Sequence, residues 1–428
     1  MINSFLFVQD SPSYKYGVGK YITCLKEGFA CRDDIKFNIV VRESFDYNEV
    51  TIINESENVR LYYIPRIDIK KNREKLAFKR AERLIDLLET IHPFEEDTVI
   101  HFVHWNGLFI ASAFAKRYSF PIIYDIHFID WQFDLKGNKQ KFVEYWNNLT
   151  NGSEKKDDEI MKPGVVYEKQ FCNIADQIIV RNSQMKIDIM DTFKPIISNI
   201  SIIHNGIKIN SVATFIKRDK RKSMNFNLDE KLILFAGRLE DQKGLHILIK
   251  AFRILLNETT DIRLLIAGNG DYDNYMSQCK DIWSKITFTG MLNAEKLADV
   301  YSIADVGVAP SLYEPFGYVI IEMMQHYLPV ITTNIDGPNE IIDDGINGLK
   351  VNVFFDEDGE RSIAPEELAE KIKLLLYTSD LGKRLSDKAF EKLNNQFTSE
   401  QMSSKIITVY KEQLLKFRSQ RNIAIDNP

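Results

Sequence analysis

The chain is poor in cysteine, with four residues (Cys24, Cys31, Cys172 and Cys279) in 428. They form neither a CxxC pair nor a cluster with histidine, so the pattern indicates no disulfide framework and no zinc site, and we expect reduced thiols in a cytosolic protein. No apolar run reaches about 18 residues, the length typical of a membrane-spanning helix. The apolar stretch near the N-terminus is short and has no basic lead, so we interpret it as a first strand and not a signal peptide.

An excess of basic charge is also missing. Lysine and arginine number 55 against 61 aspartates and glutamates, so the formal net charge is −6 and offers no global attraction to nucleic acid. The hydrophobic fraction of 44% and the charged fraction of 27% are typical of a globular protein. Because 428 residues exceed what one hydrophobic core usually serves, we expect two domains.

Short β-rich runs alternate with longer helical patterns along the chain. The strand candidates form a first series at 4–8, 36–41, 59–64, 98–103, 121–126, 177–181 and 200–204, and a second at 231–237, 262–268, 286–290, 306–310 and 329–333. Few polar residues interrupt these runs, as expected where helices cover both faces of a sheet. The alternation predicts an α/β protein with two doubly wound, Rossmann-like domains on parallel sheets.

The polar, basic stretch 207–230 separates the two series. We therefore predict an N-terminal domain over 1–207 and a C-terminal domain over 208–395. The remaining residues, 396–428, are predicted to form a helix that crosses back to the N-terminal domain.

Two glutamates, Glu314 and Glu322, lie eight positions apart in the stretch SLYEPFGYVIIEMMQHY. Glu314 follows a predicted strand, and Glu322 lies about a turn and a half inside the next helix. At the carboxyl end of a parallel strand such a pair can accept hydrogen bonds from the hydroxyls of one ligand, and the N–H groups of Phe316, Gly317 and Tyr318 favour an anion. A capping acid and a separate solvated glutamate are the simpler alternative for an isolated pair.

Two cations follow the first strand of the same predicted domain, in FAGRLEDQKGLHILIKAF. Arg238 and Lys243 flank a loop that Gly244 closes before a helix, an arrangement that fits a diphosphate. The loop alone would favour a solvated turn. A diphosphate clamp and an acidic pair in one domain together indicate a nucleotide-sugar site.

The motifs IIHNGI, FAGRLEDQKG, IAGNGDYD and the run from ITFTG to NGLKV follow one another between residues 200 and 351. In these motifs the second half resembles the nucleotide-binding domain of family 4 retaining glycosyltransferases with the GT-B fold, the glycosyl transferases group 1. The resemblance implies that Arg238 and Lys243 bind the donor diphosphate and that Glu314 contacts the donor sugar. It also implies backbone contacts from Phe316, Gly317 and Tyr318, ribose hydroxyls bound to Glu322, and loops at Gly268, Asn269 and Met291 that line the base.

The first half is compatible with the same family. Its SPSYKYGVGKYITCL resembles the family's glycine-rich first loop, in which Gly17 and Gly19 remain and Tyr16 replaces a glycine. Small residues there let backbone amides approach the diphosphate or the acceptor. PIIYDIHFID resembles the strand with the family's active-site histidine, which falls on His127; a structural histidine is the alternative. We interpret His104 as packing or an interdomain contact.

The resemblance implies that a hexose-type sugar moves from a nucleotide-diphosphate sugar, UDP-sugar before GDP-sugar, to an acceptor. The reaction would be a front-face displacement with retention, in a cleft between the domains. Arg238 and Lys243 would stabilise the leaving diphosphate, so we expect no essential metal and no other cofactor. The expected catalytic residues are His127, Glu314, Arg238 and Lys243. The Asp-x-Asp at Asp271 and Asp273 is typical of metal binding in another glycosyltransferase fold, and we interpret it as a helix cap.

Two alternatives stay open. One is a non-catalytic glycosyltransferase-like partner subunit; the other is a UDP-sugar 2-epimerase or a phosphorylase, for which we identify neither extra acid and base residues nor a cofactor lysine. The acceptor stays open among a saccharide, a lipid-linked glycan, a peptide and a small molecule, and the long segment 130–170 is expected to shape its site. The basic segment 66–84, with seven basic residues between 66 and 80, is either solvated surface or a peripheral contact with the inner membrane face.

Overall fold

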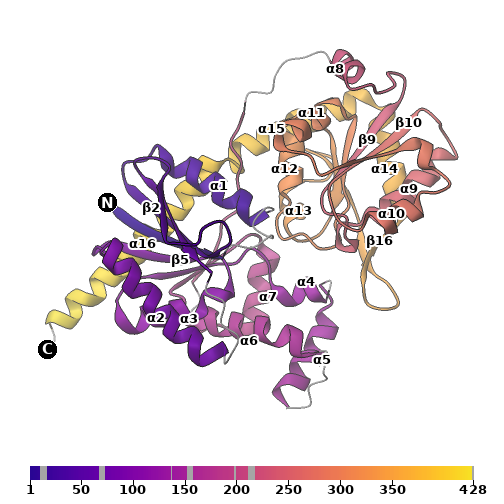
Figure 1. The fold of residues 1–428 in the computed structure, drawn as a ribbon. Coiled ribbons are helices and arrows are strands. Elements are labelled where there is room, and N and C mark those ends of the chain that lie inside the picture. The colour runs from indigo at the N-terminus through magenta and orange to yellow at the C-terminus, as the bar shows by residue number, and fades with distance from the viewer. Residues whose placement is uncertain are drawn as a thin grey trace. The chain divides into compact units, whose positions relative to one another are not determined.

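The computed structural model describes residues 1–9, 17–66, 73–135, 137–151, 158–196, 199–210 and 217–426. The chain divides into two compact units, each built around a parallel sheet (Figure 1). The first unit comprises Met1–Trp131, Asn147–Lys208 and Ser399–Pro428; the second comprises Gln132–Trp146 and Ile209–Thr398. The predicted α/β class with two doubly wound units is confirmed. We predicted a first domain that runs unbroken over 1–207. In the structure, Gln132–Trp146 groups with the second unit instead.

The first sheet has the strand order β3-β4-β2-β1-β5-β6-β7-β8. Its described strands pair in parallel, apart from the antiparallel pair β3 and β4. The strands are β1 (Ile2–Gln9), β2 (Ile35–Ser44), β3 (Thr51–Asn54), β4 (Val59–Pro65), β5 (Thr98–Phe102), β6 (Ile122–Asp125), β7 (Gln177–Val180) and β8 (Ile200–Ile202). All seven strands predicted for this half are present. The additional β3 was not predicted because its four residues lie at the sheet edge and are at best half-buried.

Helices of the first unit cover this sheet. They are α1 (Gly17–Ala30), α2 (Arg73–Ile91), η2 (Trp105–Gly107), α3 (Leu108–Arg117), α6 (Asp158–Ile174), α7 (Ser183–Phe193) and α16 (Ser399–Asp426), while α4 (Asp130–Asp134) and α5 (Lys139–Thr150) are shared with the second unit. The C-terminal helix α16 belongs to the first unit. Its Tyr410 hydroxyl oxygen lies 2.6 Å from Nδ1 of His101 on β5.

The basic segment 66–84 lies only partly in the described structure, since residues 67–72 are outside it. On α2, Lys79 and Arg80 are exposed, while Ala81, Ile85 and Leu88 are buried. The helix is thus amphipathic, and its described outer face is mixed in charge, since Glu82 and Asp86 are exposed beside the basic residues. Among the described helices, none combines the length and the apolar character needed to cross a membrane.

The second sheet is parallel, in the order β11-β10-β9-β12-β13-β14. Its strands are β9 (Lys231–Ala236), β10 (Ile262–Ala267), β11 (Ile286–Gly290), β12 (Val306–Ala309), β13 (Val330–Thr333) and β14 (Leu349–Val351), and β15 (Val353–Phe355) pairs with β16 (Arg361–Ile363) in a separate hairpin. The five strands predicted here are confirmed. The last three were not predicted because three residues are too few to show a periodic pattern.

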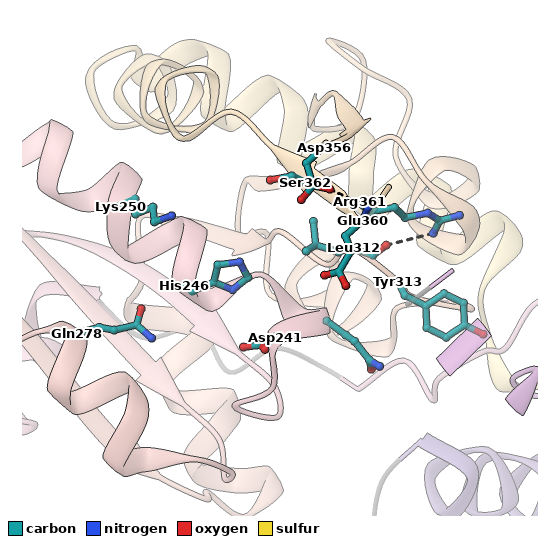
Figure 2. Close-up of a pocket in the computed structure, with 11 residues that line it drawn as sticks. Asp241, His246, Lys250, Gln278, Leu312, Tyr313, Asp356, Glu360, Arg361 and Ser362 are labelled. Atoms are coloured by element: carbon teal, nitrogen blue, oxygen red, sulfur yellow. Dashed lines mark hydrogen bonds between the residues drawn. The ribbon is translucent and has the colours of Figure 1, made fainter. Parts of the chain in front are cut away.

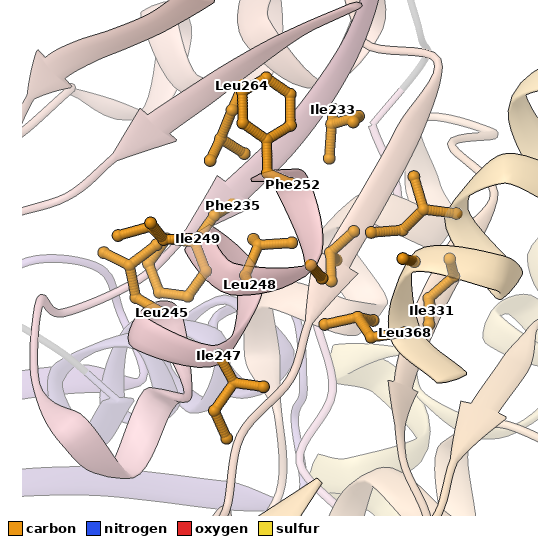
Figure 3. Packing of buried hydrophobic residues seen from close by; sticks show 14 of the residues in the cluster. Ile233, Phe235, Leu245, Ile247, Leu248, Ile249, Phe252, Leu264, Ile331 and Leu368 are labelled. Carbon is orange, nitrogen blue, oxygen red and sulfur yellow. The ribbon is translucent and has the colours of Figure 1, made fainter. Parts of the chain in front are cut away.

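The core of the second unit forms between this sheet and helix α9 (Figure 3). Leu245, Leu248 and Phe252 recur at helical spacing and pack among strand residues that include Phe235 and Leu264. Burial of each such side chain stabilises the unit by roughly 1.5–3 kcal/mol, so the start of α9 is firmly placed. The described helices of this unit are α8 (Lys217–Ser223), η3 (Asp241–Lys243), α9 (Leu245–Leu256), α10 (Tyr272–Gln278), η4 (Trp283–Lys285), α11 (Ala294–Ile303), α12 (Tyr318–Gln325), α13 (Asp336–Ile341), α14 (Pro365–Tyr377) and α15 (Ser379–Gln396).

Candidate functional site

The loops that leave the second sheet and the helix start after β12 carry the donor contacts predicted for this unit, apart from Glu322, which lies farther inside α12. In sheet order they are Met291 after β11, Gly268 and Asn269 after β10, Arg238 and Lys243 after β9, and Glu314, Phe316, Gly317 and Tyr318 after β12. The carboxyl ends of parallel strands meet at one edge, which brings these distant residues together. A hydrogen bond of 2.8 Å from Leu239 N to Asn269 O joins the β9 and β10 loops.

The exit loops of β9 and β12 are in close contact. Leu312 N donates to Gln242 O at 2.7 Å. Gly244, with φ 69°, ends η3 in the left-handed conformation, and a Cβ there would lie 2.0 Å from the carbonyl oxygen of Pro310. Only glycine fits this approach without displacement of one loop. The glycine therefore sets the distance between the two loops that hold the predicted clamp and acidic residue.

Lys243 and Glu314 form an ion pair across these loops. Lys243 Nζ donates to Glu314 Oε2 at 2.6 Å, and the side chains are 18% and 20% exposed. At this burial the two charges are only partly screened by water. The β9–β12 contact thus places an ammonium beside a carboxylate.

Arg238 lies on the same loop as Lys243. Its Nη1 donates to Glu240 Oε1 at 2.8 Å, and its guanidinium carbon lies 5.6 Å from the centre of the Phe133 ring. The side chain is about one-third exposed, so a ligand can reach it. Phe133 falls in the segment 130–170 that was expected to shape the acceptor site; its contact with Arg238 was not predicted, because more than one hundred positions separate the two residues.

Gly317 precedes the first residue of helix α12; its φ of 106° is left-handed, and it has no side chain to cap the helix. Phe316 is buried and packs edge-to-face against Tyr318, with ring centres 5.5 Å apart, which fixes the turn. A helix start without a side-chain cap concentrates partial positive charge from its first N–H groups and favours an anion.

Glu322 is half-buried on α12 and accepts a hydrogen bond of 2.8 Å from the Tyr301 hydroxyl on α11. Burial, and then the neighbouring Glu322 charge, raises the pKa of Tyr301 well above its usual value, so the phenol is a neutral donor. Tyr301 therefore orients the carboxylate. Nothing in the sequence pattern distinguishes it from a core tyrosine.

The Asp-x-Asp at Asp271 and Asp273 starts α10. Asp271 Oδ1 accepts from Asn274 N at 3.2 Å and caps the helix, which confirms the sequence interpretation, and Asp273 is exposed in the first turn. Within the described ranges, no group of three His, Cys, Asp or Glu side chains is arranged to hold a metal ion.

In the first unit His127 follows β6 and is 8% exposed. Its Nε2 lies 3.8 Å from Asp125 Oδ2, and its ring centre lies 4.3 Å from that of Tyr21, whose hydroxyl donates to the same carboxylate at 2.6 Å. Burial, with a smaller contribution from His101, lowers the pKa of His127 to about 3. The imidazole is therefore neutral near pH 7, so it offers one nitrogen as a hydrogen-bond donor and the other as an acceptor.

Gly17 and Gly19 form the first turn of α1, and the rest of the predicted glycine-rich loop, residues 10–16, lies outside the described structure. His104 has a structural role: its Nδ1 accepts from Asn106 N at 3.3 Å and caps η2. Burial lowers its pKa to about 4. These contacts agree with its interpretation as a packing residue.

A cavity of about 390 Å³ lies beside the β9 exit loop (Figure 2). Its lining includes Asp241 from η3, His246 from α9 and Glu360 near the β15–β16 hairpin. Arg361 points away from His246 and donates to the Leu312 carbonyl at 3.1 Å. Among the described residues, the lining of this cavity excludes the predicted diphosphate clamp and the acidic pair, so the cavity is distinct from the predicted donor contacts.

Comparison with known proteins identifies the family of the chain. Residues 216–392 match the family described as Glycosyl transferases group 1. The chain is 32% identical over 275 residues to an uncharacterized glycosyltransferase of Methanocaldococcus jannaschii, a match that covers 59% of this chain and 68% of that protein.

Solved structures share the fold over nearly the whole chain. Sucrose-phosphate synthase from Thermosynechococcus elongatus has a TM-score of 0.73 and 20% identity over 97% of this chain and 100% of its own. HepE from Anabaena, in complex with UDP-glucose, has a TM-score of 0.68 and 15% identity over 96% of this chain and 100% of its own. At these identities the likeness shows the fold alone, and it confirms the predicted GT-B class.

Proposed function

The chain belongs to the glycosyl transferases group 1 and is a glycosyltransferase, and from that premise we propose that it transfers a hexose-type sugar from a nucleotide-diphosphate sugar with retention of configuration. The observation that carries the proposal is the ion pair between Lys243 and Glu314. It holds a cation suited to a diphosphate beside a carboxylate suited to sugar hydroxyls, at the carboxyl edge of a parallel sheet.

The proposed donor lies along the sheet edge. Met291 and Asn269 are exposed at the β11 and β10 end and would line the base together with Gly268, whereas Glu314 at the β12 end would contact the sugar. Glu322 would accept from the ribose hydroxyls. A UDP-sugar is the first choice, which the UDP-glucose complex of the structurally similar HepE supports, and a GDP-sugar is the second.

Departure of the diphosphate creates negative charge next to Arg238, Lys243 and the α12 start near Gly317. Each well-placed donor of this kind accelerates such a step by roughly 10²–10³-fold. In the proposed front-face displacement, the bond from the anomeric carbon to the phosphate oxygen breaks and the acceptor oxygen bonds to the same face of that carbon, while the leaving phosphate takes the proton of the acceptor hydroxyl. The two cations make an essential metal unnecessary, and no other cofactor is proposed.

His127 is the proposed contact to the sugar or the acceptor from the first unit, with Gly17 and Gly19 as further backbone contacts. Its neutral ring suits hydrogen bonding better than charge stabilisation. The proposal includes a cytoplasmic location and an acceptor that is a saccharide, a lipid-linked glycan, a peptide or a small molecule.

Release of nucleoside diphosphate from UDP-, GDP- and ADP-sugars tests the proposal. The assay compares wild type with Glu322→Ala, with and without EDTA. We expect EDTA-resistant release from one donor, with strong loss in the variant. Failure of the wild-type chain to bind any donor would contradict the proposal and favour the non-catalytic partner subunit.

A further inference from the structure

The segment Gln132–Trp146 comes from the first half of the chain yet belongs to the second unit. It includes the end of α4 and the start of α5, and it falls in the segment 130–170 that we expected to shape the acceptor site. Its described contacts reach three parts of the second unit: the β9 exit loop, the β12 exit loop and the residues of the β15–β16 turn. The first two are the loops of the proposed donor site.

Phe133 contacts the β9 exit loop in two ways. The ring faces the guanidinium of Arg238, with 5.6 Å between the guanidinium carbon and the ring centre. The backbone carbonyl of Phe133 accepts a hydrogen bond of 2.7 Å from Gln242 Nε2. Gln242 lies in η3 immediately before Lys243. Phe133 therefore contacts the β9 exit loop both at Arg238 and next to Lys243.

Buried polar contacts hold Phe133 in place from both sides. Tyr313, on the β12 exit loop, donates through its hydroxyl to Gln132 Oε1 at 3.2 Å, and both side chains are at most 5% exposed. Asn138 Nδ2 donates to the Gly359 carbonyl at 2.6 Å and is 4% exposed. Loss of a buried partner is costly, so the segment is firmly attached to the second unit.

We propose that Phe133 is a positioning residue for the diphosphate clamp, acting through Arg238. An aromatic face attracts a guanidinium without occupying its N–H donors. Glu240 already accepts from Nη1 of Arg238, so the ring limits the orientations of the guanidinium from a second side without taking another of its donors from a diphosphate. The inference rests on the proposed function and assigns this segment to the donor side.

The test compares Phe133→Leu and Phe133→Tyr with wild type in titrations with UDP, GDP and ADP and with the matching nucleosides. Phe133→Leu keeps the carbonyl that Gln242 contacts but removes the ring. We expect it to weaken binding of the preferred diphosphate by about 3- to 30-fold, the range of a cation–π contact, and to leave nucleoside binding unchanged. Phe133→Tyr should retain wild-type affinity.

Two further variants separate positioning from general damage. In an Arg238→Met background, Phe133→Leu should cause no additional loss, because the ring acts through that guanidinium. Tyr377→Leu is the matched control, since it removes another ring of this unit that faces a cation, Lys231 at 5.5 Å, and should leave affinity unchanged.

The outcomes are distinguishable. If wild type binds one diphosphate and Phe133→Leu binds it equally well, or loses nucleoside affinity by the same factor, the positioning role is refuted and the proposed function stands. If wild type binds none of the three diphosphates, the proposed function fails and this inference fails with it.

Discussion

Replacement of Gly244 by alanine tests whether the β9 and β12 exit loops approach each other as closely as the structure shows. The residue has φ 69°, and the new Cβ would meet the Pro310 carbonyl oxygen at 2.0 Å. The left-handed conformation costs an L-residue roughly 1–2 kcal/mol. Relief of the overlap requires one loop to move, which adds about 1–3 kcal/mol, typical of overpacking.

Gly345 provides a matched control in the same unit. Its φ is 72°, but nothing lies within 4 Å of the position that a Cβ would take, so Gly345→Ala incurs the conformational cost alone. In scanning calorimetry, each kcal/mol lowers the Tm of a unit of this size by roughly 2–4 °C. We therefore expect Gly244→Ala to melt at least about 2 °C below Gly345→Ala.

The same pair of variants connects packing with activity. A displaced β9 loop separates Lys243 from Glu314, so Gly244→Ala should also raise the donor KM, whereas Gly345→Ala should not. Equal Tm shifts and equal donor KM values for the two variants would refute the close approach of the loops and its role in the site.

Three further predictions concern single contacts. Tyr301→Phe removes the hydroxyl that orients Glu322 and should raise the donor KM by about 2- to 10-fold with the acceptor KM unchanged, which steady-state kinetics would check. Asp271→Ala removes a cap and should lower the free energy of unfolding by about 1 kcal/mol while turnover stays the same with or without magnesium; lost turnover would instead indicate a metal ligand. Burial lowers the pKa of His101 and His127 to about 3 each, below the unfolded value, so the unfolded chain binds more protons between pH 6.5 and 3 and stability falls as the pH drops through that window. Between pH 7 and pH 5, the free energy of unfolding obtained from urea titrations should fall by about 2 kcal/mol per histidine. Imidazole NMR resonances of the folded protein that titrate near pH 6.5 would contradict the lowered pKa values.

Elements with a strong local pattern could be predicted from the sequence. The longer strands are continuous apolar runs because helices cover both faces of the sheets, and a run such as KLILFA therefore identifies β9. The position of a residue next to a strand end is also visible in the sequence. Arg238 and Glu314 were predicted as candidate site residues on that basis, because ligands bind at the carboxyl edge of a parallel sheet.

Contacts between distant segments could not be predicted. Phe133 and Tyr301 are ordinary aromatic residues in their own helices, and their significance comes from Arg238 and Glu322, which reach them only through tertiary packing. The assignment of Gln132–Trp146 to the second unit likewise rests on buried polar contacts that leave no periodic pattern in the sequence.

Calorimetric titration of Lys243→Met tests the central claim most directly, that the β9 and β12 exit loops bind a diphosphate. The ligands are the nucleoside diphosphate of the preferred donor and its nucleoside, and Lys250→Met, an exposed lysine on α9, is the control. Loss of one charge-assisted hydrogen bond should weaken diphosphate binding by about 10- to 150-fold and leave the nucleoside and the control unchanged. Undiminished diphosphate affinity, or an equal loss for the nucleoside, would contradict the account.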